Sequence, residues 1–206
     1  MADKLVTEDC FLAVGALLIV SVRLVLLFVA HHPMGKLALQ FLWTILHNGP
    51  VYMRFGRYAL PILNGEDYKF ELGKGVLMAD GTDVTLVGTG FMVSTCLDAR
   101  ELLAKEGISA RVVNIHTIKP IDKDILIKAA KETGALVTAE EHTIYGGLGS
   151  AVAEVLVENC PVPMARVGVE DTFGRSGTVP ALMEYYGLTA ENIAKKAKEV
   201  ISKKLV

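Results

Sequence analysis

The sequence has few cysteines, no excess of basic charge and no cluster of metal-binding residues. Its three cysteines, Cys10, Cys96 and Cys160, lie far apart, and none forms a CxxC pair or a group with histidine. This spacing argues against a disulfide framework and a zinc site, and it favours a reducing, cytoplasmic compartment. The formal net charge of −2 at pH 7 provides no basic field that would attract nucleic acid.

A long apolar run occupies residues 11–30. A helix of this length would cross roughly 30 Å of hydrocarbon, so a membrane-inserting segment is one interpretation. Arg23 lies near the middle of the run, where insertion costs about 2.5–3.5 kcal/mol, and no aromatic belt flanks it. The residues before the run are more acidic than basic, which is unlike a signal peptide. We therefore expect a cytoplasmic protein, with a membrane tether through residues 11–30 as the alternative.

The composition changes near residue 48. Residues 1–48 form an atypical apolar segment to which the pattern assigns no fold, and Asn48-Gly49-Pro50 then breaks any regular element. Residues 51–55 are predicted to form a strand. We interpret residues 49–75 as the end of one domain and a linker, and residues 76–206 as a separate domain.

Strand-like and helix-like segments alternate from residue 76 onward. This alternation predicts an α/β fold with three layers, α/β/α, in which helices cover both faces of a mostly parallel five-stranded sheet. Asp122 and Thr178 are predicted to cap two of the helices. The expected strands are 76–78, 84–88, 110–115, 135–139 and 165–169, and the expected helices are 91–106, 122–132, 147–159, 178–187 and 190–204.

Two glycine-rich turns each follow a strand and open a helix. Gly88-Thr89-Gly90 lacks the third glycine and the acidic residue of a dinucleotide fingerprint, so we interpret it as a tight strand-to-helix turn. Gly146-Gly147-Leu148-Gly149 could bind an anion through amides at a helix N-terminus. No P-loop lysine follows, and we favour close packing at this loop.

Glu140-Glu141-His142 ends a strand just before the second glycine loop. A carboxylate and an imidazole at a strand end could perform acid–base chemistry. Neighbouring strand residues point to opposite faces, however, so Glu140 and Glu141 would not act as a pair, and we favour a structural or interface role. His116, which follows another strand, is expected to be a structural histidine.

Five segments, in order, carry a resemblance to the C-terminal domain of transketolases. Together they cover about residues 76–206, and they are most similar to split bacterial and archaeal transketolases, whose C-terminal half is a separate chain. The same domain type occurs in deoxyxylulose-phosphate synthases and in the beta subunits of 2-oxo acid dehydrogenases. The segments are DVTLVGTG at 83–90, RVVNIHTIKPID at 111–122, AEEHTIYGGLGSAVAEVL at 139–156, DTFGRSG at 171–177 and EYYGLTA at 184–190.

This resemblance implies a transferase that moves a two-carbon ketol unit between sugar phosphates, the chemistry of the pentose phosphate pathway. It implies thiamine diphosphate and Mg²⁺ in the assembled enzyme, bound outside this chain. It also implies a partner N-terminal subunit that holds the diphosphate, a homodimer, and no activity of this chain alone. The alternatives are a deoxyxylulose-phosphate synthase or dehydrogenase beta-type subunit, and a catalytically silent interaction domain.

The resemblance assigns functional roles to only a few residues of this sequence. GPVYMRFGR at 49–57 resembles the end of the pyrimidine-binding domain, and Arg57 matches the arginine that contacts the substrate's phosphate. A guanidinium suits bidentate phosphate contacts. Glu141, His142, Gly146 and Gly147 are candidates for an interface or an active-site wall. No catalytic residue and no metal ligand is assigned. Residues 1–36 do not align with the family, so its catalytic glutamate has no counterpart that we can assign.

Overall fold

The computed structural model describes residues 46–54, 61–65 and 68–204, and the chain divides into two compact units. The described part of the first unit consists of residues 46–54 and 68–70. The predicted strand at 51–55 is wrong for Val51–Arg54, which have irregular backbone. A strand needs a hydrogen-bonded neighbour, and none among the described residues pairs with this segment.

Two sequence features lie outside the described residues: the apolar run at 11–30 and Arg57. Among the helices that the structure does describe, none has the length and apolar character needed to cross a membrane.

The second unit contains a five-stranded sheet in the order β1-β3-β2-β4-β5. β1 runs antiparallel to β3, and the other neighbours are parallel, which confirms the mostly parallel sheet. β4 extends beyond the predicted strand because its pairing with β5 resumes at Thr143 after an irregularity. The strands are β1 (Val76–Ala79), β2 (Val84–Gly88), β3 (Ala110–Asn114), β4 (Leu136–Thr143) and β5 (Met164–Val169).

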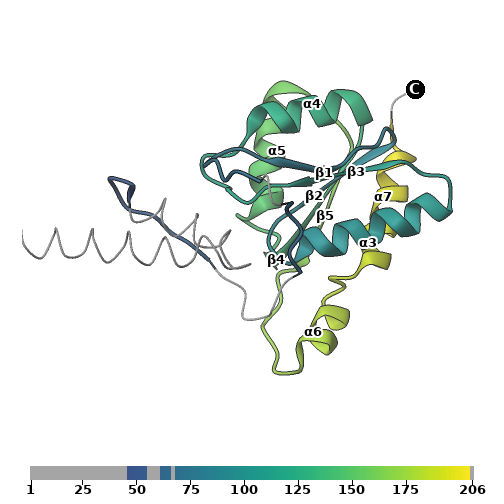
Figure 1. Cartoon of the computed structure of the whole chain (residues 1–206). Helices are drawn as coiled ribbons and strands as arrows, with labels where there is room; N and C mark the ends of the chain where they lie inside the picture. Colours follow the sequence, from purple (N-terminus) through teal and green to yellow (C-terminus); the bar gives the residue numbers. More distant parts are fainter. Residues whose placement is uncertain (1–45, 55–60, 66–67, 205–206) are drawn as a thin grey trace, which may run out of the picture. The chain divides into compact units, whose positions relative to one another are not determined.

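Helices cover both faces of the sheet, as the alternating pattern predicts (Figure 1). The pair α3 and α7 packs on one face, and the pair α4 and α5 packs on the other. The fifth helix, α6, has no buried residue. The bounds are α3 (Met92–Lys105), α4 (Lys123–Thr133), α5 (Leu148–Asn159), α6 (Val179–Tyr185) and α7 (Ala190–Ile201).

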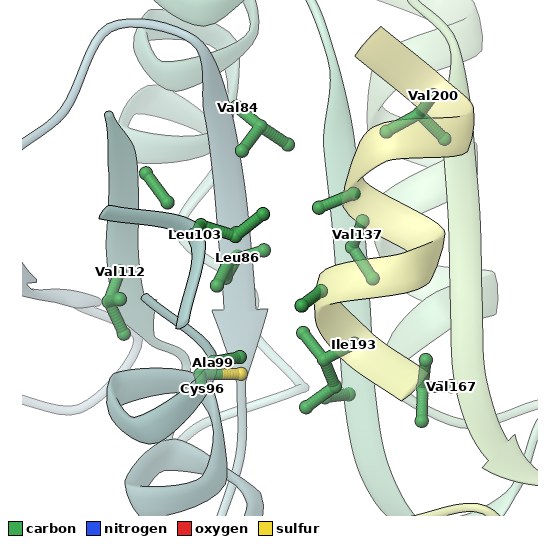
Figure 2. Packing of buried hydrophobic residues seen from close by; sticks show 14 of the residues in the cluster. Val84, Leu86, Cys96, Ala99, Leu103, Val112, Val137, Val167, Ile193 and Val200 are labelled. Carbon is green, nitrogen blue, oxygen red and sulfur yellow. The ribbon is translucent and has the colours of Figure 1, made fainter. Parts of the chain in front are cut away.

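Two hydrophobic clusters, one on each side of the sheet, form the core. Leu86 faces the α3–α7 side, while its neighbour Val87 faces the α4–α5 side. Every residue of β2 is buried because both faces of this central strand are covered. Figure 2 shows the α3–α7 cluster, which includes Val84, Cys96, Leu103, Val112, Val137, Ile193 and Val200.

Two helices begin directly after the residues that were predicted to cap them, but only one of these residues makes a capping hydrogen bond. Asp122 is the N-cap of α4, and its carboxylate accepts a hydrogen bond from the Ile125 amide at 3.3 Å. The cap prediction at this helix is confirmed. Thr178 occupies the N-cap position of α6, but its side chain makes no capping bond, and Pro180 stands at the start of the helix instead.

Candidate functional site

The glycine loop and the end of β4 are joined by one buried carboxylate. Glu140 is 2% exposed. Its Oε2 accepts a hydrogen bond from the Leu148 amide at 2.7 Å, and its Oε1 accepts one from the Gly149 amide at 2.9 Å. Both amides belong to the first turn of α5, where the helix dipole favours a negative charge. The anion-binding end of this helix therefore exists, but the chain's own carboxylate occupies it.

Gly147 is required by this arrangement. A Cβ atom at Gly147 would lie 1.9 Å from the Glu140 Oε2 and 3.1 Å from the Thr143 carbonyl oxygen. No side chain fits in that space without displacing the carboxylate. The close packing that the sequence predicts at this loop is present, and the group that approaches the glycine comes from within the same domain.

Glu141 and His142 have a different environment from Glu140. Both are exposed, whereas Glu140 is buried, so the two neighbouring glutamates lie in different environments. The sequence brings them close in the chain, but the structure gives them different roles. Glu140 accepts hydrogen bonds from the first turn of α5. Glu141 and His142 lie on the surface at the carboxyl end of β4.

The loop between β4 and α5 is braced and displays an aromatic side chain. The Ile144 carbonyl oxygen accepts hydrogen bonds from the Arg166 guanidinium at 2.9 Å and from the Ser150 hydroxyl at 3.3 Å. Arg166 also lies 5.5 Å from the centre of the Tyr145 ring. Tyr145 is 59% exposed. Sequence reasoning missed Tyr145 as a surface feature, because only the strand pairing brings Arg166 to this loop.

The order of the strands reverses at β2 and β4, which is where doubly wound sheets bind ligands. In this domain the amides of the helix that follows β4 are already bonded to Glu140. The turn after β2 is also tightly packed, since a Cβ at Gly88 would lie 3.0 Å from the Cα of Val93. The interpretation of 88–90 as a tight strand-to-helix turn therefore fits better than a dinucleotide site.

His116 lies just beyond the end of β3. Its Nδ1 is 2.9 Å from the Thr117 hydroxyl, and burial lowers the pKa of its imidazole below the ordinary value of 6.5. Burial disfavours the charged form of an imidazole, so the folded protein favours neutral His116. This environment agrees with a structural histidine.

Two observations bear on a site for a diphosphate with Mg²⁺ among the described residues. Within residues 46–54, 61–65 and 68–204, no group of three or more histidine, cysteine, aspartate or glutamate side chains could hold a metal ion. The N-terminus of α5 is bonded to a carboxylate, which would repel a second anion. Arg57 lies outside the described residues, and the roles assigned to Arg57, Glu141, His142, Gly146 and Gly147 remain predictions.

Comparisons with protein-family models and with individual proteins point to the same family. Residues 73–193 match the family model described as "Transketolase, C-terminal domain". A 6-deoxy-6-sulfo-D-fructose transketolase subunit from Clostridium sp. (strain MSTE9) is 47% identical over 170 residues, which are 82% of this chain and 53% of that protein. A 1-deoxy-D-xylulose-5-phosphate synthase from Heliobacterium modesticaldum is 42% identical over 157 residues, which are 75% of this chain and 24% of that protein.

A solved structure agrees with these relatives. It is described as "Split gene transketolase, inactive beta4 tetramer", where beta denotes a subunit. It is 48% identical, with a TM-score of 0.74 over 76% of this chain and 52% of that chain. The chain thus spans about half the length of the relatives that are split subunits. Family model, sequence relatives and fold all agree. The chain therefore belongs to the transketolase family, and residues 73–193 form its C-terminal domain.

Proposed function

We propose that this chain is the C-terminal part of a transketolase that transfers a two-carbon ketol unit between sugar phosphates. It works with a partner chain that holds thiamine diphosphate and Mg²⁺. The observation that carries the proposal is the match of residues 73–193 to the transketolase C-terminal domain, with split subunits among the relatives. The Glu140 carboxylate occupies the anion-binding end of α5 at the sheet's switch point, which supports a diphosphate site outside this domain.

The proposed division of labour follows from the resemblance to the family. The cofactor supplies the carbanion chemistry, and the proteins supply binding and orientation. In this chain, Arg57 would hold the substrate's phosphate, far from the reacting carbon, and so orient the sugar. Glu141, His142 and the loop at Gly146 and Gly147 would form an interface or the outer wall of the active site.

The proposed assembly contains more than one chain. The similar split-gene structure is a tetramer of one subunit type and is described as inactive. Its inactivity supports a need for the diphosphate-binding subunit, and we expect this chain to contribute homodimers to the assembly. We place the assembled enzyme in the cytoplasm, where sugar phosphates are available.

A ketol-transfer assay tests the proposal. The chain would be assayed with thiamine diphosphate and Mg²⁺, alone and mixed with the diphosphate-binding transketolase subunit of the same source, using a ketose phosphate donor and an aldose phosphate acceptor. We expect activity only in the mixture. Activity of the chain alone would contradict the proposed division of labour. A folded chain that is inactive in both assays would instead indicate a catalytically silent interaction domain.

A deoxyxylulose-phosphate synthase is the second candidate, because one such enzyme is 42% identical over three quarters of this chain. The same mixture would then convert pyruvate and glyceraldehyde phosphate with loss of carbon dioxide. Release of carbon dioxide without ketol transfer would favour this alternative. A dehydrogenase beta-type subunit is less well supported, since its substrate carries no sugar phosphate for Arg57 to bind.

A further inference from the structure

The segment from residue 170 to residue 187, here called the arm, leaves the end of β5 and contains α6. All nine residues from 170 to 178 are exposed, and α6 has no buried residue. Figure 1 shows α6 standing apart from the sheet and from the four helices that cover it. Only Met183 and Tyr186 of the arm pack against the core of the domain, while residues 170–178 remain exposed.

The arm is nevertheless ordered by contacts within itself. The Tyr186 hydroxyl donates a hydrogen bond to the Phe173 carbonyl oxygen at 3.1 Å. The Arg175 guanidinium lies 4.2 Å from the centre of the Tyr185 ring, and the Tyr185 and Tyr186 rings meet edge to face at 4.9 Å. These contacts fix the loop while leaving Phe173 97% exposed and Tyr185 54% exposed.

The β4–α5 loop carries a further exposed aromatic side chain at the end of the sheet where the arm begins. β4 and β5 are parallel neighbours, and Thr143 pairs with Val169, so the β4–α5 loop and the arm leave the sheet at the same end. Tyr145 projects from that loop. Preordered aromatic side chains with arginines beside them are typical of the energetic centres of protein interfaces. We call Phe173 and Tyr185, the exposed aromatic side chains of the arm, the aromatic surface.

The charge of the arm identifies the kind of partner that would fit. Its ionisable side chains other than tyrosine are Glu170, Asp171 and Glu184 against Arg175 alone, a formal charge of −2. Arg175 also stacks on Tyr185. A two-fold contact between copies of the arm would bring this negative charge against itself, and like charges across an interface are costly. A partner surface with excess lysine and arginine would be complementary.

We propose that the aromatic surface docks this chain onto the diphosphate-binding partner subunit, at an apolar pocket surrounded by lysine and arginine side chains. This inference rests on the proposed function, because it names the contact through which that partner would be held. Phe173 inserts into the pocket, and the arm's carboxylates face the basic rim.

Association of the full chain with the diphosphate-binding subunit tests this proposal. Titration calorimetry at low and high salt would compare the wild type with Phe173→Ala and Glu184→Lys. Because Phe173 is almost fully exposed, its loss leaves the fold intact, and we expect the Kd to rise about tenfold or more. Glu184→Lys is expected to raise the Kd about threefold at low salt and to weaken its salt dependence.

Matched controls lie on the last turns of α5, outside the aromatic surface. Val157→Ala removes an apolar side chain that is 70% exposed, and Glu158→Lys reverses an exposed charge. Both should leave the Kd unchanged. The proposal is overturned if Phe173→Ala and Val157→Ala bind the partner subunit with the same Kd. It is also overturned if Phe173→Ala changes only the oligomeric state of this chain, measured by sedimentation. The activity of the wild-type mixture tests the proposed function separately from the docking surface. If that mixture is active and Phe173→Ala binds the partner with the wild-type Kd, the docking surface is wrong and the proposed function stands.

Discussion

At the residue scale, Glu140 connects the sheet to a helix. The carboxylate of Glu140 accepts hydrogen bonds from two amides of α5 and lies against Gly147, so one side chain links a strand, a loop and a helix. Hydrogen bonds to charged groups contribute about 1.5–3 kcal/mol each, and a buried amide that loses its partner is costly. Burial alone would disfavour a carboxylate here, and the two amides at the helix N-terminus compensate for it.

Replacement of this carboxylate should destabilise the domain. Glu140→Gln keeps the size of the side chain but places an NH₂ group against one of the two donating amides. We expect the free energy of unfolding to fall by about 2 kcal/mol, measured by urea denaturation. The exposed neighbour gives the control, since Glu141→Gln should change the free energy of unfolding by less than about 0.5 kcal/mol. Equal effects of the two substitutions would show that the Glu140 contacts are unimportant.

His116 should make stability depend on pH. Burial lowers its pKa in the folded state below 6.5, so the unfolded chain takes up the proton first as the pH falls. Stability is therefore fully retained above about pH 6.5 and is lost as the pH falls from there through the folded pKa. We expect His116→Asn to flatten this part of the stability profile, measured by thermal melting between pH 5 and 8. An unchanged slope in His116→Asn would contradict this assignment.

Arg57 should matter for substrates that carry a phosphate. In the reconstituted enzyme, Arg57→Ala is expected to raise the KM for phosphorylated sugars by about tenfold or more and to change the KM for unphosphorylated sugars little. Arg57→Lys, which keeps the charge but loses the bidentate geometry, should have an intermediate effect. Equal effects on both classes of sugar would contradict the phosphate role.

At the scale of elements, α4 is fixed at its start by Asp122. One carboxylate oxygen accepts a hydrogen bond from the Ile125 amide, and the other accepts one from the Gly75 amide at 2.9 Å. The same side chain therefore caps the helix and holds the segment that enters β1. The helix start and the entry of the chain into the domain are thereby coupled.

Removal of this cap should cost more than removal of a nearby surface charge. We expect Asp122→Ala to lower the free energy of unfolding by about 1–2 kcal/mol, because both amides lose their acceptor. Asp124→Ala, in the same first turn, loses a favourable interaction with the helix dipole and an exposed ion pair with Lys74 at 4.0 Å, and should cost about 0.3–1 kcal/mol. Urea denaturation of both variants measures the difference, and a reversed order would be evidence against the coupling.

At the scale of the whole molecule, the second unit is built around its own core. Every residue of the two hydrophobic clusters lies between Val84 and Val200. We therefore expect a chain that lacks residues 1–47 to retain a cooperative unfolding transition, followed by circular dichroism during heating. A gradual, non-cooperative loss of signal would show that the missing residues contribute to the folding of this unit.

The sequence by itself determined the layers of the second unit. Strand and helix periods differ, so apolar runs such as 84–88 and amphipathic segments such as 190–204 are distinguishable without tertiary information. The five strands and five helices agree with the predicted segments to within a few residues. The strand predicted at 51–55 was wrong over Val51–Arg54, because a strand depends on a neighbour that local sequence does not reveal.

Tertiary structure alone decided what the glycine loop binds and which side chains reach the surface. The sequence shows a loop able to hold an anion, but only the fold brings Glu140 onto the α5 amides, eight and nine residues away. Similarly, Arg166 reaches Tyr145 only because β4 and β5 are paired. Local patterns follow from backbone geometry, whereas the partner of a polar group depends on contacts between segments that are distant along the chain.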